Sequence, residues 1–266
     1  MNIKQKNIIV LFLFLSLNFN ILNAGESVVN STRSVDEEIY FLFSIAYLMG
    51  GNSPDFFDFY KNELLGVSKE FKLSPSINFG LIYDLNDISS IILISEFNRA
   101  VINDNYNEII SSGHTGVRNI TQNFDISSLP ITINYKYHPV VSNYFTYVMI
   151  GFGVAYNQIK WEERVYSSIQ DDIRKGGLHY NNSLFYPILK LSSGIELEFD
   201  QKSEKNFLRS FFFELNFNFF FRSADIFSKA ENQFYNKTEG FAKNYTILPY
   251  YFGLNLGLNF SLNFVN

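Results

Sequence analysis

The stretch Tyr250–Phe264, which reads YYFGLNLGLNFSLNF, decides the fold. Every second residue in it is large and apolar: Tyr250, Phe252, Leu254, Leu256, Leu258, Phe260, Leu262 and Phe264. The residues between them are mostly glycine, asparagine and serine. A strand places alternate side chains on opposite faces, whereas a helix would spread the same residues around its circumference. The alternation therefore predicts a long β-strand with one apolar face and one small, polar face.

Two earlier segments repeat this alternation. In residues 210–222 one parity is held by Phe211, Phe213, Leu215, Phe217, Phe219 and Phe221. In residues 189–199 the apolar parity is held by Leu189, Leu191, Ile195, Leu197 and Phe199. Weaker versions of the pattern predict strands at 144–160, 124–137, 88–100, 74–84 and 38–49. The sequence thus predicts an all-β chain, an up-and-down barrel of eight antiparallel strands.

The connections between these strands fall into two alternating classes. Those at 85–87, 138–143 and 200–206 are short, whereas those at 50–73, 101–123, 161–183 and 223–245 are each about twenty residues long and polar. Tight turns at one end and long loops at the other are typical of bacterial outer-membrane barrels, whose long loops lie outside the cell. Both chain ends are then expected in the periplasm.

Side-chain volume predicts which face of the barrel points outward. The interior of an eight-stranded barrel is just wide enough to be filled by side chains, so five or six large apolar residues from every strand would overfill it. A continuous apolar ring on the outside is rare on soluble monomers but suits lipid. The pattern therefore favours a transmembrane β-barrel over its alternative, a soluble lipocalin-like binder with the same strand count.

The N-terminus and the composition agree with export. Lys4 and Lys6 precede an apolar run of about ten residues, and Leu22-Asn23-Ala24 ends in a small residue, which predicts a signal peptide at 1–24. A flexible lead-in at 25–37 and the barrel at 38–266 would follow. The chain has no cysteine, a mean hydropathy of −0.02 and a net charge of −5, so disulfides, thiol chemistry and nucleic-acid binding are not expected.

Charged residues also occupy the inward parity of the predicted strands: Glu96, Lys136, Lys190, Glu196, Glu198, Glu214 and Arg222. Both signs are present on neighbouring strands, and an unpaired charge in so narrow an interior would be costly. We expect a lumenal network of ion pairs and hydrogen bonds. The alternative is an ion path, although open channels normally need about sixteen strands.

In residues 38–264 the chain resembles the outer membrane protein β-barrel domain family, the small barrels of the OmpA and OmpX type. The resemblance is carried by Tyr147–Asn157, YVMIGFGVAYN, and by Leu191–Phe199, LSSGIELEF. It implies outer-membrane lipid and the barrel-assembly machinery as partners. The last strand resembles the insertion signal that this machinery recognises, with Asn255, Gly257, Phe260 and Leu262 at matching spacing. Family members commonly end on an aromatic residue, whereas Val265 and Asn266 follow Phe264 here.

Catalytic, metal and cofactor sites are not predicted. A lipid-modifying barrel enzyme remains an alternative, because small barrels that resemble this chain in architecture include such enzymes. It would need a base from among His114, His138 and His179, with Ser111, Ser112, Asp171 and Asp172 nearby in the long loops. The preferred hypothesis is an envelope component that presents its long loops for adhesion or ligand binding. Candidate contact residues in those loops are Tyr106, Tyr166, Tyr180, Phe234 and Tyr235.

Overall fold

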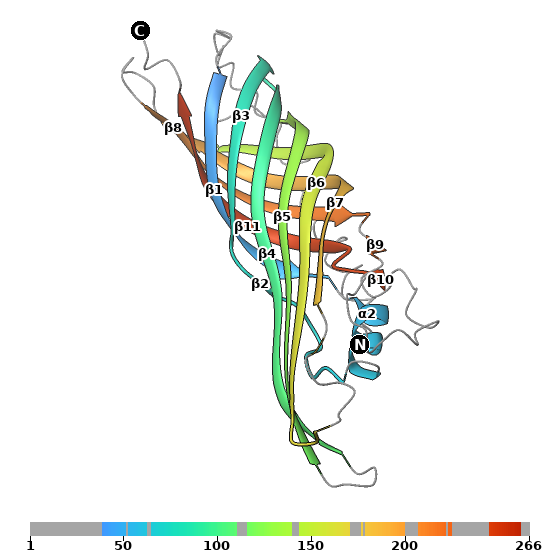
Figure 1. Cartoon of the computed structure of the whole chain (residues 1–266). Helices are drawn as coiled ribbons and strands as arrows, with labels where there is room; N and C mark the ends of the chain where they lie inside the picture. The colour runs from blue at the N-terminus through green and yellow to red at the C-terminus, as the bar shows by residue number, and fades with distance from the viewer. Residues whose placement is uncertain are drawn as a thin grey trace, which may run out of the picture.

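The computed structural model describes residues 39–51, 53–62, 65–110, 116–139, 144–170, 177, 179–199, 207–221, 223–224 and 245–261. Across these residues eight long strands form one closed antiparallel barrel (Figure 1). They are β1 (Ile39–Gly50), β3 (Ser76–Asn86), β4 (Ser89–Ile110), β5 (Gly116–Tyr137), β6 (Tyr144–Ser167), β7 (His179–Glu198), β8 (Leu208–Phe220) and β11 (Tyr250–Ser261). The predicted fold class and strand number are confirmed, whereas the predicted signal peptide and lead-in lie outside the described residues.

The barrel closes between its first and last strands. β1 pairs with β3 on one side and with β11 on the other, where Tyr40 lies opposite Ser261 and Met49 opposite Phe252. Each other strand pairs with its neighbours in the chain, so the topology is up-and-down. The described ends, Ile39 and Ser261, lie at the end of the barrel that carries the short β3–β4 turn.

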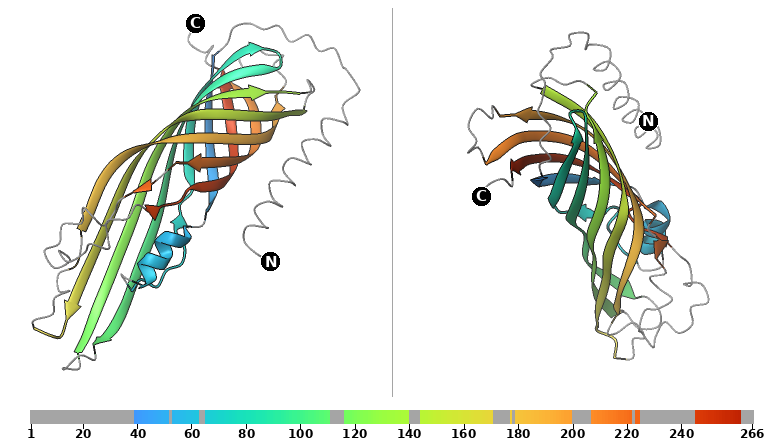
Figure 2. Two further views of the ribbon diagram at one scale, coloured as in Figure 1. Left: turned by 90° about the vertical axis from the view of Figure 1, so that its right-hand side faces the viewer. Right: turned by 90° about the horizontal axis from the view of Figure 1, so that it is seen from above.

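Four strands continue well past the rest of the barrel. β4, β5, β6 and β7 project beyond the other strands as one curved sheet (Figures 1 and 2). Two connections that the sequence predicted as loops are therefore largely strand, because β4 extends to Ile110, β5 starts at Gly116, β6 extends to Ser167 and β7 starts at His179. The expectation of loops at 101–123 and 161–183 was wrong.

The connection at 50–73, also predicted as a loop, contains the helix α2 (Pro54–Asn62) and the strand β2 (Lys72–Leu73). β2 pairs with β4 just past the start of β3, and β9 (Ser223–Ala224) pairs with β10 (Tyr245–Thr246). α2 lies beside the projecting sheet (Figure 2). No helix within the described part of the chain is long and apolar enough to cross a membrane.

Glycine makes close packing possible within the barrel wall. A Cβ atom added to Gly153 would lie 1.9 Å from the backbone carbonyl oxygen of Ile131 on the neighbouring strand. A Cβ atom on Gly151 would lie 1.9 Å from the Asn134 Oδ1 atom. Gly153 is therefore needed because the backbone of β5 approaches it closely, and Gly151 leaves the space that the Asn134 side chain occupies.

Candidate functional site

The outer face of the barrel is an apolar band. On β5 the outward residues are Tyr137, Tyr135, Ile133, Ile131 and Leu129. Ile133 and Phe152 leave 64% and 63% of their surface exposed, yet they lie in the middle of the wall. The span from Leu129 to Tyr137 matches the roughly nine to eleven tilted residues with which a strand crosses a bilayer. A contiguous exposed band of this kind is stable in lipid and not in water.

The band ends at a definite place on the projecting strands. Leu129, Tyr156 and Phe185 lie opposite one another and form the last row of the contiguous apolar band. The next row along the strands consists of Ser127, Gln158 and Ser183. We call the parts of β4–β7 beyond the apolar row, residues 98–110, 116–128, 157–167 and 179–184, the blade. The blade begins where the lipid-facing surface ends.

Lys190 and Glu96 form the innermost ion pair of the lumen. Their exposed fractions are 1% and 2%, so both charges are removed from water. The second Glu96 oxygen accepts a hydrogen bond from the Tyr251 hydroxyl at 2.9 Å, and the Asn98 amide donates to that hydroxyl at 2.9 Å. The pair is therefore held by one uncharged donor from β11, the Tyr251 hydroxyl, which Asn98 of β4 in turn holds in place.

A second ion pair joins Lys136 to Glu196. Ser210 and Asn259 donate hydrogen bonds to the same carboxylate. The Lys136 ammonium also lies 4.1 Å from the centre of the Tyr147 ring. The two ion pairs therefore each join strands that are not neighbours in the barrel wall, since Lys136 lies on β5, Glu96 on β4, and Glu196 and Lys190 on β7.

Glu214 completes the buried part of this network. Its carboxylate accepts hydrogen bonds from the Tyr147 hydroxyl at 3.0 Å and from the Asn255 amide at 2.9 Å. The Asn216 amide in turn donates to Asn255 at 2.8 Å. A chain of polar contacts therefore runs from Lys136 through Tyr147 and Glu214 to Asn255 and Asn216.

The turn end of the lumen holds a cation that sequence reasoning missed. Arg209 is buried, its guanidinium lies 3.1 Å from Asp84 and 3.6 Å from Glu198, and it stacks over the Tyr40 ring at 3.5 Å. Glu198, predicted to be lumenal, is half-buried at this mouth. Arg209 faces inward because the pairing of β8 with β11 shifts register next to it, which simple alternation cannot reveal. The predicted network member Arg222 lies outside the described residues.

Side chains fill the lumen. The cavities beside Lys136 measure about 10 Å³ each, roughly the space of one water molecule. Apolar residues add to this filling, since Ile92, Ile94, Met149 and Phe212 pack together inside the wall. The alternative of an ion path finds no support in this part of the chain.

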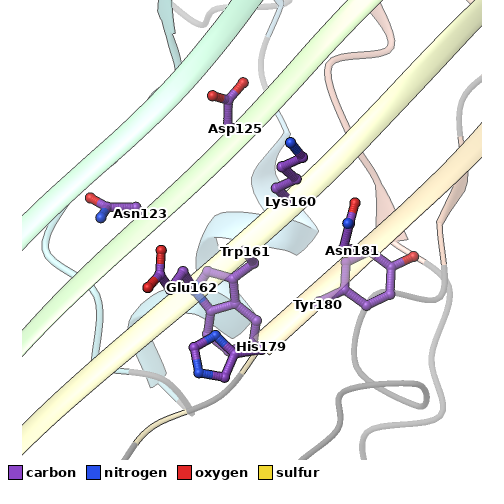
Figure 3. Close-up of a pocket in the computed structure, with 8 residues that line it drawn as sticks. All are labelled: Asn123, Asp125, Lys160, Trp161, Glu162, His179, Tyr180 and Asn181. Carbon is purple, nitrogen blue, oxygen red and sulfur yellow. The ribbon is translucent and has the colours of Figure 1, made fainter.

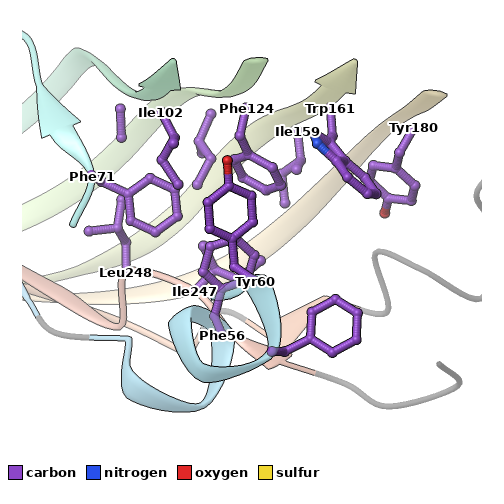
Figure 4. Packing of buried hydrophobic residues seen from close by; sticks show 13 residues of the cluster. Phe56, Tyr60, Phe71, Ile102, Phe124, Ile159, Trp161, Tyr180, Ile247 and Leu248 are labelled. Carbon is purple, nitrogen blue, oxygen red and sulfur yellow. The ribbon is translucent and has the colours of Figure 1, made fainter. Parts of the chain in front are cut away.

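Beyond the membrane band the inner face of the sheet becomes apolar. Phe56 and Tyr60 of α2 pack against the inner face of the blade in a cluster that includes Phe124 and Trp161 (Figure 4). The Phe56 ring lies 5.3 Å from the Phe124 ring. We call α2 together with residues 65–73 the cap. Cap and blade form a hydrophobic core outside the bilayer, of the kind found in soluble proteins.

Asp104 fastens the cap to the blade. Its carboxylate accepts hydrogen bonds from the Tyr60 hydroxyl at 2.9 Å, from the backbone nitrogens of Val67 and Ser68 at 2.7 and 2.9 Å, and from the Ser68 hydroxyl at 2.5 Å. Burial raises the pKa of Asp104, but these hydrogen bonds outweigh it and leave its pKa below the usual value. Burial and the neighbouring Asp104 raise the pKa of Tyr60. Asp104 is thus a charged acceptor that only the docked cap can satisfy.

The residues of the alternative enzyme hypothesis are not brought together where they are described. His138 is buried near the turn end, with its ring 5.8 Å from the Tyr147 ring, whereas His179 is exposed on the blade. His114, Ser111, Ser112, Asp171 and Asp172 lie outside the described residues. Tyr180, predicted as a contact residue, is instead buried in the cap core, so that prediction was wrong.

No family model matches the chain, and no curated protein matches it. Similar solved structures include a major outer membrane protein from Thermus thermophilus, with 11% identity over 84% of this chain and 99% of that chain and a TM-score of 0.45. Neisserial surface protein A has 12% identity, covers 84% and 97%, and has a TM-score of 0.39. Ail, the attachment invasion locus protein of Yersinia pestis, has 10% identity, covers 84% and 97%, and has a TM-score of 0.33.

The fold is established by the strand pairing, and the orientation of its faces by the apolar outer band and the polar lumen. The chain is an eight-stranded antiparallel β-barrel whose apolar outer band suits a membrane.

Proposed function

We propose that the chain is an integral outer-membrane protein whose barrel holds the blade and cap at the cell surface, where the blade contacts an extracellular partner. One observation carries the proposal: on β5 both faces change polarity at the same row. From Tyr137 to Leu129 the outward residues are apolar and most inward residues are polar, whereas from Ser127 to Asn119 the outward residues are polar and the inward residues include Ile126, Phe124 and Ile120. Lipid surrounds the first arrangement and water the second.

The composition of the blade favours binding. Its outer face carries exposed asparagines: Asn103, Asn105, Asn107, Asn119 and Asn123. At its far end Ile109, Val117 and Tyr166 are exposed by 71%, 47% and 68%. Asparagine supplies adaptable hydrogen bonds and tyrosine supplies rigid contact area, the combination that binding loops use. Because the blade is a hydrogen-bonded sheet, little ordering entropy is lost on binding.

The proposal also covers assembly. We expect Asn255, Gly257, Phe260 and Leu262 to serve as the insertion signal for the barrel-assembly machinery, which the resemblance of the last strand supports. The proposed role in assembly and binding needs no catalytic residue.

Cysteine labelling tests the orientation, because the chain has no cysteine of its own. N107C lies on the blade and D87C in the β3–β4 turn. In intact cells a membrane-impermeant maleimide should label N107C at once and D87C only after the outer membrane is permeabilised. The reverse order, or equal labelling of both, would refute the proposed orientation.

Attachment measurements test the binding role. Bacteria expressing the chain are applied to arrays of immobilised matrix proteins and glycans, beside a strain without it and a strain carrying I109S/V117S/Y166S. The proposal expects retention that depends on the chain and falls in the triple variant. Equal retention of all three strains would remove the binding role and leave an envelope component.

A further inference from the structure

A polar groove of about 590 Å³ lies on the outer face of the blade, close to the membrane band (Figure 3). Three neighbouring strands supply its outward side chains: Asn123, Asp125, Lys160, Glu162, His179 and Asn181. Trp161 and Tyr180, whose side chains turn into the cap core, complete the lining. The six polar residues form two adjacent rows of the sheet, so their side chains all project from the same face.

The acids of the groove are already neutralised. Asp125 forms an ion pair with Arg99, and Glu162 forms one with Arg164 at 2.6 Å. In the described part of the chain, no hydrogen bond or ion pair engages the side chains of Lys160 and His179. With histidine counted as uncharged, the groove and its ion-pair partners carry three cations, Lys160, Arg99 and Arg164, and two anions, Asp125 and Glu162. The groove therefore offers an ammonium, an imidazole and two amides to a ligand rich in acceptor oxygens.

The distance between the groove and the apolar band limits which ligands the groove can bind. Lys160 lies four residues beyond Tyr156, the β6 member of the apolar row that ends the band. Four residues correspond to roughly 13 Å along a strand, and to less along the membrane normal because strands tilt. The polar headgroup layer is roughly 5–8 Å thick on each side of the hydrocarbon. A lysine side chain can reach down over that distance with its ammonium in the headgroup layer.

We propose that this groove binds the phosphate of an anionic lipid headgroup in the outer leaflet. Lys160 supplies the charge, while Asn123, Asn181 and His179 offer hydrogen-bond donors. The lipid's acyl chains would lie against the apolar row that includes Tyr156 and Phe185, directly beneath the groove. A soluble phosphate would gain nothing from that row. The inference rests on the membrane placement proposed above.

Native mass spectrometry of the purified protein in detergent tests the groove. The probes are dioleoyl phosphatidic acid, dioleoyl phosphatidylcholine and inorganic phosphate. K160Q should bind phosphatidic acid about fivefold more weakly than the wild type, the effect of one basic residue near an anionic surface. K160R should restore binding. K69Q, which removes the same charge from an exposed position on the cap, should leave binding unchanged.

Two outcomes would overturn the inference. Unchanged retention of phosphatidic acid in K160Q would show that the groove is not the site, and inorganic phosphate bound as tightly as the lipid would show that the ligand is soluble. Heat-dependent gel migration of each variant confirms that it is folded. If N107C is labelled in intact cells as expected while K160Q does not change lipid binding, only the proposal for the groove has failed. If N107C is not labelled in intact cells, the proposed function itself is rejected.

Discussion

Lys190 and Glu96 stabilise the lumen only as a pair. Each is almost fully buried, and a buried charge that loses its partner keeps the whole cost of its removal from water. The remaining hydrogen bond to Glu96 comes from the uncharged Tyr251 hydroxyl and cannot replace the ammonium. The wall therefore tolerates loss of both charges better than loss of one.

We predict that K190M lowers the free energy of unfolding by about 3–5 kcal/mol, because Glu96 is left as an uncompensated charge. Urea unfolding in detergent micelles, followed by gel migration, measures the change. K160M, which removes a lysine from the exposed face, should change it by less than about 0.5 kcal/mol. The double variant K190M/E96M should recover most of the loss; a double variant as unstable as K190M would contradict the pairing.

Asp104 makes the docking of the cap depend on pH. Its pKa is lowered in the folded chain, so its stabilisation is fully present above the ordinary aspartate value of about 3.9 and is lost as the pH falls through the lowered value. Acidification over that range should therefore shift the fluorescence of Trp161, the chain's single tryptophan, to longer wavelength as the cap loosens. D104N should show a weaker cap and lose this transition; an identical transition in D104N would assign it elsewhere.

Alternation along a strand predicts which side chains face the lumen only where the strand is regular. Glu96, Lys136, Lys190, Glu196 and Glu214 share the inward parity and are buried, because a regular strand turns every second side chain inward. Arg209 was missed because a register shift next to it breaks the count. Such irregularities depend on the pairing of two strands and leave no mark in either strand alone.

At the scale of elements, the projecting strands were misread for a physical reason. On β5 the apolar residues take the outward parity at Leu129 and Ile131 but the inward parity at Phe124 and Ile126. The strand is unbroken, yet its apolar residues change parity where the surroundings change from lipid to water. The predicted strand at 124–137 crosses this reversal, but beyond it the outward positions are the polar residues Asn123, Thr121 and Asn119, and a polar segment of this kind was predicted as a loop.

The helix α2 did have a detectable signal. Ser53 and Pro54 are residues typical of the N-cap and first turn of a helix, and Phe56, Phe59 and Tyr60 then follow at helical spacing on one face. The Ser53 carbonyl accepts a hydrogen bond from the Phe57 nitrogen at 3.0 Å. A helix of nine residues is marginal by itself, so its apolar face needs the blade to pack against.

We predict that F56A undocks the cap without opening the barrel. Removing a fully buried phenylalanine costs about 3–5 kcal/mol, and here the loss falls on a cluster outside the membrane. Proteolysis in residues 53–73 should become rapid and Trp161 emission should shift to longer wavelength, while the folded barrel still migrates differently from the boiled one. D58A, on the exposed face of α2, is the control. Loss of the folded band in F56A would show that cap and barrel are one cooperative unit.

At the scale of the whole molecule, a single sheet has one part in lipid and another part in water. Its lower part presents apolar side chains to lipid and holds a polar network inside, while its upper part presents polar side chains to water and holds an apolar core under the cap. The closed barrel was predictable because eight alternating segments admit few other arrangements. The blade and cap were not, since their packing joins residues from five separate elements.

The position of the membrane boundary tests the account most directly. Single cysteines replace the outward residues of β5 in turn: Ile133, Ile131, Leu129, Ser127, Asp125 and Asn123. The protein is reconstituted in lipid vesicles and treated with a water-soluble maleimide. Labelling should be slow through Leu129 and rise steeply between Leu129 and Asp125. Rapid labelling at all six positions would show that water surrounds the whole strand, and the chain would then not be a membrane barrel.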